Sequence, residues 1–151
     1  MLSIPTPKPS AHPVDVGLRS EMAIANALVQ LGYAVFMPVG QNHRYDLLLD
    51  LGDRFLRVQC KTGRLKRGVI QFNTVSTRGN RSSVYRRGYQ GQVDAFAVHC
   101  PQNHANYLVP IEVLPTGIGS LRLAPTRNGQ ERGISWAADY ALPDYRDGAT
   151  T

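Results

Sequence analysis

Residues 45–61 read YDLLLDLGDRFLRVQCK, two short apolar runs joined by a Gly-Asp pair. That pair is typical of a two-residue hairpin turn that opens with glycine. With these two residues as the loop, counting outward places Asp46 directly opposite Gln59, and alternation puts Lys61 on the same face. The opposite face then carries the apolar side chains Leu47, Leu49, Leu56, Val58 and Cys60. An acid, an amide and a lysine therefore converge at the open end of the predicted hairpin.

A helix is expected ahead of this hairpin, over residues 16–31, because apolar side chains recur there at helical spacing. Asp15 is its candidate N-cap and Gly32 its candidate end. The apolar positions are Leu18, Ile24, Ala25, Leu28 and Leu31. Glu21 falls on the same face, where burying a carboxylate is costly unless a cation or a metal ion compensates its charge. A second interpretation places Glu21 at the rim of that face, where it reaches solvent.

The remainder of the chain is interpreted as short strands and short helical segments. Strands are expected at residues 33–37, 46–51, 54–61, 68–74, 93–99 and 107–109. Short helices or turns are expected at residues 81–90, 111–114 and 136–140. A leading helix followed by a strand meander favours an α/β or α+β sandwich. The four prolines of residues 1–14 indicate a flexible arm, residues 15–145 are expected to form a single domain, and residues 146–151 a flexible tail.

Length and composition limit the class of protein. The chain has 151 residues, of which 42% are hydrophobic and 19% charged, as in a single globular domain and unlike a disordered chain. The two cysteines, Cys60 and Cys100, cannot form a disulfide framework and suit a reducing cytoplasm. Because the apolar runs are too short to cross a bilayer, we expect a cytoplasmic protein with no membrane partner.

Positive charge is concentrated in one part of the chain. The formal net charge is +6, and ten of the 17 basic residues lie between Arg54 and Arg87, with no Asp or Glu from Arg54 to Val93. Such a block favours a polyanionic partner, because neutralising phosphates releases condensed counterions. Nucleic acid is the leading interpretation, and an acidic protein, a membrane surface or a merely solvated loop are the alternatives. The candidate DNA contacts are Arg64, Lys66, Arg67, Arg78, Arg81, Arg86 and Arg87.

The order of the singled-out residues resembles the active site of a known family. Glu21 on a helix, Asp46 in a hairpin and Gln-Cys-Lys on the next strand (residues 59–61) look like the PD-(D/E)XK nucleases. The spacing is most similar to the branch found as group I intron homing endonucleases in cyanobacteria, where Gln replaces the second acid. Tyr45 departs from the motif, which has proline there. The resemblance covers about residues 17–142 and implies a restriction-endonuclease-like core, a central mixed β-sheet flanked by helices.

The resemblance also implies Mg²⁺-dependent hydrolysis of phosphodiester bonds in double-stranded DNA, with Mn²⁺ able to replace Mg²⁺. Asp46 is then the principal metal ligand. It is joined by Gln59, by the backbone carbonyl of Cys60 and, directly or through water, by Glu21. Lys61 positions or deprotonates the attacking water and offsets the phosphate charge. Since Gln59 brings no charge, one bound Mg²⁺ is expected rather than two.

The leading functional prediction is therefore a site-specific homing endonuclease that associates with the nucleoid when bound to DNA. A nuclease similar to Holliday junction resolvases and a non-catalytic DNA-binding protein of the same fold are the alternatives. Cutting both strands needs two active sites, so a homodimer or a dimer of dimers is expected. A zinc site is the weaker interpretation, because its spacing matches none of the usual zinc pairs. Its ligands would be Cys60, His99, Cys100 and His104.

Overall fold

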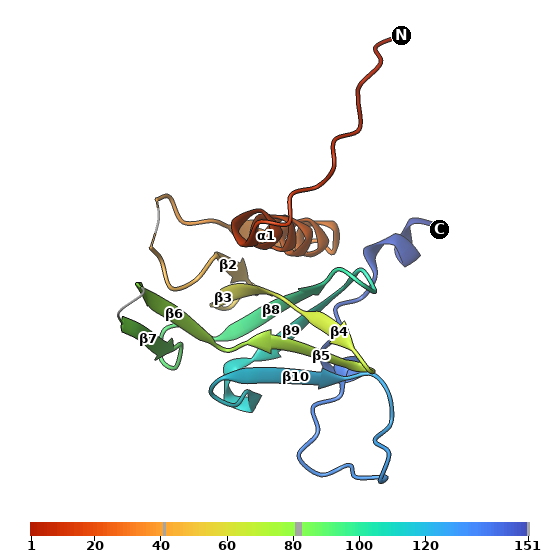
Figure 1. The fold of residues 1–151 in the computed structure, drawn as a ribbon. Helices are drawn as coiled ribbons and strands as arrows, with labels where there is room; N and C mark the ends of the chain where they lie inside the picture. Colours follow the sequence, from red (N-terminus) through yellow and green to blue (C-terminus); the bar gives the residue numbers. More distant parts are fainter. Residues whose placement is uncertain (41, 81–82, 151) are drawn as a thin grey trace.

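The computed structural model describes residues 1–40, 42–80 and 83–150 of the chain. Its centre is a five-stranded mixed sheet with the strand order β1-β2-β3-β8-β9 (Figure 1). The strands are β1 (Ala34–Phe36), β2 (Leu47–Asp50), β3 (Phe55–Thr62), β8 (Ala95–Cys100) and β9 (Ala105–Pro110). Strands β3 and β8 run parallel, whereas the other neighbouring pairs are antiparallel. The central mixed sheet that the sequence predicts is thus present.

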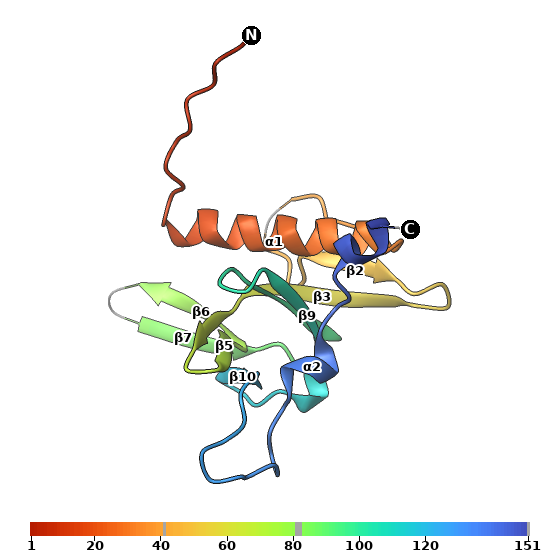
Figure 2. The same cartoon turned by 90° about the vertical axis from the view of Figure 1, so that its right-hand side faces the viewer.

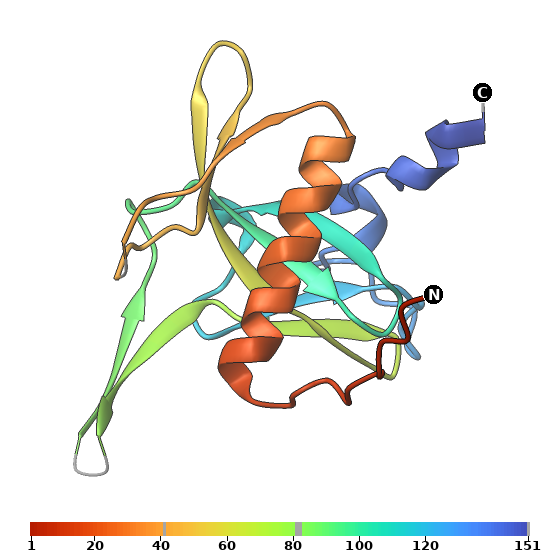
Figure 3. The same cartoon turned by 90° about the horizontal axis from the view of Figure 1, so that it is seen from above.

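Helix α1 (Pro13–Gln30) crosses one face of this sheet (Figure 3). The apolar cluster beneath the helix joins it to β2, β3 and β8. Its buried members are Ile24, Leu28, Leu47, Leu49, Val58 and Ala97. Burying a side chain such as Leu or Ile contributes about 1.5–3 kcal/mol. This cluster therefore fixes α1, which carries Glu21, against the β2–β3 hairpin, which leads to Gln59 and Lys61.

A three-stranded antiparallel sheet, in the order β10-β5-β4, lies against the opposite face of the central sheet (Figures 1 and 2). Its strands are β4 (Arg64–Lys66), β5 (Val69–Asn73) and β10 (Ile118–Arg122). The second apolar cluster fills the space between the two sheets and includes Ile70, Phe72, Phe96, Val98 and Leu121. Three short helical segments follow β9 or β10: η1 (Ile111–Val113), α2 (Ala137–Tyr140) and η2 (Tyr145–Thr150). The first two lie where the sequence predicts short helices or turns.

A separate strand pair projects from the body of the molecule (Figures 2 and 3). It consists of β6 (Val75–Asn80) and β7 (Ser83–Gly88), which run antiparallel with Thr77 opposite Arg86. The expectation of a short helix over residues 81–90 is therefore wrong where the structure describes them. The physical reason is that β7 is stabilised by pairing with β6, and the sequence of residues 81–90 alone does not reveal that partner.

Helix α1 begins earlier than the sequence predicts. Pro13 lies in its first turn, and His12 is the N-cap, since the His12 Nδ1 atom accepts the Val14 N–H at 3.3 Å. Proline suits this position because its missing N–H would have no intrahelical acceptor there. Asp15 is consequently inside the first turn and is not the cap. The predicted end is confirmed, because Gly32 has a φ of +96° just beyond the helix.

The buried stripe of α1 is also rotated relative to the predicted one. Its buried members are Ser20, Ile24, Ala27 and Leu28. Leu18, by contrast, is 53% exposed, and Glu21 is half-buried at the border of the stripe. Helical spacing alone allows either stripe, and packing against β2, β3 and β8 selects this one. Of the two interpretations of Glu21, the structure supports the position at the rim of the apolar face.

The predicted register of the β2–β3 hairpin is confirmed from Leu47 to the turn. The predicted pair of Asp46 with Gln59 is not formed, because the Asp46 N–H donates to the Val58 carbonyl instead. Leu47 pairs with Val58, and the Leu51 N–H donates to the Arg54 carbonyl at 2.9 Å. The turn opens at Gly52, whose φ of +93° lies in the left-handed region that glycine adopts without strain. Local turn chemistry therefore sets which residues of β3 face the start of β2.

Candidate active site

Strand β3 extends further than its neighbour β2, and the sheet has an open corner there. Strand β2 pairs with residues 55–58 of β3, whereas β8 pairs with residues 58–62. The segment that enters β2 ends at Asp46, beside the unpaired length of β3. Side chains from both faces of a sheet can meet at such a corner, because no neighbouring strand separates the two faces.

Asp46 is held against β3 by two backbone contacts. Its N–H donates to the Val58 carbonyl at 2.8 Å. The regular pairing of β2 with β3 therefore begins at Leu47, the residue after Asp46. Its Oδ2 atom accepts the Cys60 N–H at 2.7 Å. Burial raises the pKa of the Asp46 carboxyl, and the hydrogen bond from Cys60 and the positive charge of Lys61 partly oppose this. The carboxylate therefore lies beside the Cys60 backbone rather than opposite Gln59.

Glu21 reaches the same corner from helix α1. It lines a cavity of about 280 Å³ together with Asp46 and side chains of the β1–β2 loop. The loop residues are Met37, Pro38, Gly40, Asn42, His43 and Tyr45. Burial raises the pKa of the Glu21 carboxyl, and the negative charge of Asp46 raises it further. Two carboxylates from segments distant in the sequence thus face one recess and repel each other.

Cys60 lies between these two carboxylates and the core. Burial raises the pKa of its thiol well above the ordinary value, and the charges of Asp46 and Glu21 add to the shift. The Cys60 side chain packs against the apolar cluster under α1. Its neighbours Gln59 and Lys61 therefore point to the other face of β3. The raised pKa favours the protonated thiol, and the Cys60 group that bonds to Asp46 is the backbone N–H.

Lys61 contacts aromatic side chains on that other face. Its Nζ atom donates to the Tyr89 hydroxyl at 3.4 Å and lies 5.0 Å from the centre of the Tyr89 ring. It also lies 5.8 Å from the centre of the Phe96 ring. Its positive charge acts on Asp46 and lowers the pKa of that carboxyl. Gln59 is half-buried two residues before it on the same strand.

Two residues at this corner, Arg44 and Tyr89, were not singled out as site residues by the sequence. Arg44 places its guanidinium carbon 3.9 Å from the centre of the Tyr89 ring. It also donates to the Gly88 carbonyl at 2.7 Å and to the side-chain oxygen of Gln92. These contacts join segments more than forty residues apart. The one signal available in the sequence was the presence of tyrosines within the basic block.

The donor atoms at the corner suit a hard cation. The carboxylates of Asp46 and Glu21 line the recess and offer oxygen, which Mg²⁺ and Mn²⁺ prefer. The other two predicted ligands, the amide of Gln59 and the carbonyl of Cys60, are oxygen donors on the adjacent length of β3, and the structure does not place the Gln59 side chain in the recess. Burial is the largest cause of the raised pKa of both carboxyls, so a positive charge beside them would favour their ionised form. A divalent cation would supply that charge, so the residues present fit the metal ion that the resemblance implies.

The alternative zinc site is not assembled. Within residues 1–40, 42–80 and 83–150, no three or more His, Cys, Asp or Glu side chains form a group that could hold a metal ion. His99 Nδ1 is instead hydrogen-bonded to Asn106 at 2.8 Å. The Cys100 thiol is buried and donates to Gln102 at 3.4 Å.

The candidate DNA contacts fall on two structural elements. Arg64 and Lys66 are exposed on β4, and Arg67 is exposed in the turn that follows it. Arg78 lies in β6, and Arg86 and Arg87 lie in β7. Arg81 lies outside the described residues. The candidate DNA contacts in the described residues therefore lie on β4 with its following turn and on the projecting β6–β7 pair.

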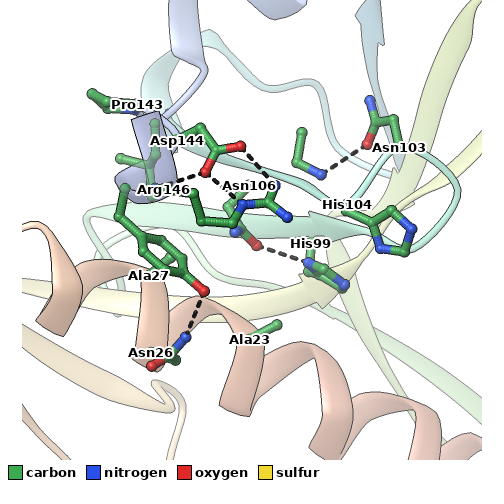
Figure 4. Close-up of a pocket in the computed structure, with 13 residues that line it drawn as sticks. Ala23, Asn26, Ala27, His99, Asn103, His104, Asn106, Pro143, Asp144 and Arg146 are labelled. Atoms are coloured by element: carbon green, nitrogen blue, oxygen red, sulfur yellow. Dashed lines mark hydrogen bonds and ion pairs between the residues drawn. The ribbon is translucent and has the colours of Figure 1, made fainter. Parts of the chain in front are cut away.

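A second cavity, of about 240 Å³, lies between α1, the β8–β9 loop and the C-terminal segment (Figure 4). Its polar side chains bond to one another: His99 pairs with Asn106, and Asn26 donates to the Tyr145 hydroxyl at 3.1 Å. The cavity is lined by none of the nuclease-site residues predicted from the sequence. The corner at the end of β3 is therefore the candidate active site.

Comparison with known proteins places this geometry in a family. The sequence model of the PD-(D/E)XK endonuclease family matches residues 11–143. The chain therefore belongs to the PD-(D/E)XK endonucleases, as the order of its site residues predicted, and it is a nuclease that acts on DNA. Nucleases of this family generally depend on divalent metal ions. No curated protein matches the chain.

A solved structure agrees with this assignment at the level of the fold. It is described as the structure of a bacterial homing endonuclease, I-Ssp6803I. The two chains share 23% sequence identity and superpose with a TM-score of 0.71, over 87% of this chain and 89% of the other. The predicted restriction-endonuclease-like core is confirmed. None of the helices in the described residues is long and apolar enough to span a membrane.

Proposed function

We propose that this protein is a Mg²⁺-dependent endonuclease that hydrolyses phosphodiester bonds at specific sites in double-stranded DNA, as a homing endonuclease does. One observation carries the proposal. At the open corner of β3, Glu21 and Asp46 line one recess. Burial and the charge of Asp46 raise the pKa of Glu21 there, and the charge of Lys61 acts on Asp46. The fold shared with a bacterial homing endonuclease supports site-specific cutting.

The metal ligands in this proposal are Asp46, Glu21, Gln59 and the backbone carbonyl of Cys60. They would hold Mg²⁺, or Mn²⁺ in its place, because oxygen donors with two negative charges suit a hard divalent cation. When bound, the cation supplies Lewis acidity toward the phosphate and lowers the pKa of water. Gln59 adds an oxygen without a charge, so we expect a single bound ion.

The side chains of the corner have separate tasks in hydrolysis. The Cys60 N–H occupies Oδ2 of Asp46 and so fixes the orientation of that carboxylate. Glu21 brings a second negative charge from α1. The Lys61 ammonium orients the attacking water and offsets the negative charge that builds up on the phosphoryl oxygens. Each task follows from the position of the residue in the fold: Glu21 on α1, Asp46 directly before β2 and Lys61 on β3.

DNA would lie along the basic elements next to this corner. Arginine can bind a phosphate or a guanine edge through two hydrogen bonds. The candidate contacts are Arg64, Lys66, Arg67, Arg78, Arg81, Arg86 and Arg87. Since one chain carries one corner, cutting both strands calls for a homodimer or a dimer of dimers.

The proposal is tested by incubating the protein and Mg²⁺ with a randomised duplex library and with a four-way junction, then mapping the ends. Lys61→Ala and Asp46→Asn should abolish cleavage and change duplex affinity by at most a few-fold. Asp50→Asn is the matched control, since Asp50 lies at the other end of β2 and accepts the Gly52 N–H. That variant should cut at the wild-type rate.

The same experiment separates the alternatives. Recurrent ends in the duplex library support a site-specific enzyme. Preferential cutting of the junction would instead indicate a nuclease similar to Holliday junction resolvases. DNA binding without cleavage of either substrate would indicate a non-catalytic DNA-binding protein, and full cleavage by Lys61→Ala would contradict the role assigned to Lys61.

A further inference from the structure

Lys61 is oriented by aromatic groups rather than by a carboxylate. Among the described residues, Lys61 forms no ion pair with a carboxylate, unlike Arg57 with Asp94 and Arg146 with Asp144. The ammonium instead donates to the Tyr89 hydroxyl at 3.4 Å. It also lies against the rings of Tyr89 and Phe96, and attraction between a cation and an aromatic ring is strongest where water is excluded.

Tyr89 is itself firmly held. It is 4% exposed, and its ring meets Phe96 edge-on, with the ring centres 5.2 Å apart and the planes at 88°. The Arg44 guanidinium lies 3.9 Å from the Tyr89 ring centre. Arg44 also donates to the Gly88 carbonyl and to the Gln92 side chain, on either side of Tyr89 in the chain. Because Tyr89 is held in one orientation, its hydroxyl and ring can restrict the orientation of the Lys61 side chain.

These contacts join three parts of the molecule that the proposed function uses. Gly88 is the last residue of β7, so Tyr89 follows directly on the projecting strand pair. Arg44 precedes Asp46 by two residues in the segment that enters β2. Lys61 lies on β3. A single aromatic ring thus links the root of the basic strand pair, the Asp46 segment and the lysine.

We propose that Tyr89 is the positioning residue for Lys61 and that Arg44 holds Tyr89 in place. This inference rests on the proposed function, in which Lys61 acts on the water and the phosphate. Neither Tyr89 nor Arg44 needs to touch the reacting atoms. Removing either one leaves the ammonium charge present but free to adopt many rotamers, and a long lysine side chain loses considerable entropy when it must be ordered again for each turnover.

The kinetic test uses variants that keep shape or charge. Tyr89→Phe retains the ring and removes the hydroxyl, and Arg44→Lys retains the charge and removes the planar stacking group. Each should lower the single-turnover cleavage rate at saturating DNA by about ten-fold, the equivalent of one hydrogen bond. DNA affinity should change by less than about two-fold, because every phosphate-binding side chain is still present. A weaker affinity at an unchanged rate would show that Arg44 binds DNA and would overturn the inference.

Tyr107→Phe is the matched control. Tyr107 is 3% exposed on β9, and its hydroxyl accepts a hydrogen bond from Asn103 at 3.0 Å. It makes no contact with Lys61 in the described part of the chain. The variant removes a comparable buried hydroxyl, so any decrease in rate caused by general destabilisation should appear in it as well. We expect Tyr107→Phe to cleave DNA at the wild-type rate. An equal decrease in the cleavage rates of Tyr107→Phe and Tyr89→Phe would overturn the inference.

A second measurement is independent of nuclease activity. The chain has three lysines, of which Lys8 and Lys66 are exposed. In the DNA-free protein with ¹³C-labelled lysine, the Lys61 side chain should show contacts to the Tyr89 ring and slow side-chain motion. In Tyr89→Leu, its motion should approach that of the two exposed lysines. If the wild type cuts no DNA, the proposed function fails while this result still stands, and an ordered Lys61 in Tyr89→Leu overturns the inference.

Discussion

The hydroxyl groups of Ser20 and Thr62 lie 2.6 Å apart and join helix α1 to strand β3. Ser20 is 2% exposed and precedes Glu21, and Thr62 follows Lys61. This hydrogen bond therefore connects α1, which carries Glu21, to β3, which carries Lys61. A buried hydroxyl that loses its partner is costly, whereas removing both partners is nearly neutral.

The first prediction concerns this link. Ser20→Ala and Thr62→Val should each lower the free energy of unfolding by about 1–3 kcal/mol, because each leaves one hydroxyl unpaired. The double variant should be destabilised by less than the sum of the two single effects. Urea denaturation of the four proteins measures the difference. Strictly additive effects would mean that the two hydroxyls do not interact in solution.

The second prediction concerns pH in the metal-free protein. Burial raises the pKa of Asp46 above its ordinary value of 3.8, so the folded state holds this proton more tightly than the unfolded chain does. Unfolding then releases protons, and the Asp46 contribution to the free energy of unfolding falls as pH rises from about 4. Asp46→Asn should therefore stabilise the protein at pH 7 and have little effect below about pH 4. Denaturation in EDTA at both pH values measures this, and a variant less stable than wild type at pH 7 would contradict the raised pKa.

The third prediction concerns the charge of the metal site. Gln59→Glu adds a third carboxylate to the proposed metal ligands, so Mn²⁺ affinity measured by calorimetry should rise. The metal-free variant should be less stable than wild type, because like charges in the recess repel one another. Gln71→Glu on the exposed side of β5 is the control and should leave Mn²⁺ affinity unchanged. Equal affinities in both variants would place the metal ion elsewhere.

The fourth prediction concerns DNA binding. Affinity should fall steeply as salt rises, and the double variant Arg64→Ala, Lys66→Ala should reduce the salt slope by about two, one for each phosphate that these side chains no longer neutralise. Cleavage at saturating DNA should be retained, since neither side chain belongs to the corner. Arg146→Ala serves as control, because Arg146 pairs with Asp144 near the C-terminus. A wild-type DNA affinity that does not change with salt concentration would contradict the role of the basic block in DNA binding.

The hairpin at the centre of the site was predictable because its determinants are local. A turn that opens with Gly52 fixes the register from Leu47 onward, so the pairing of Leu47 with Val58 follows from counting. The position of Asp46 does not, because its N–H bonds to Val58 and its carboxylate to the Cys60 N–H. The order of Glu21, Asp46 and Lys61 along the chain was sufficient to indicate the family. The fold and the family were therefore predictable from the sequence, and the set of metal ligands stays a prediction.

Contacts between distant segments could not be predicted from local patterns in the sequence. Strand β7 forms by pairing with β6, and the strands β4, β6 and β10 carry no strong apolar alternation of their own. The contact of Lys61 with Tyr89 spans 28 residues, and the hydrogen bond of Arg44 to Gln92 spans 48. No periodic pattern encodes such partners. They follow from how the layers pack, which also decides that Glu21 lies at the rim of the helix face.

The most direct test of the central claim is affinity cleavage of the polypeptide with Fe²⁺ in place of Mg²⁺, in the presence of ascorbate and peroxide. Radicals formed at the bound ion cut the backbone nearby, so the fragments report which segments surround it. We expect cuts close to residues 21, 46 and 60 in the wild type, suppressed by excess Mg²⁺ and absent in Asp46→Asn. Mg²⁺-sensitive cuts that avoid these three segments would contradict the account.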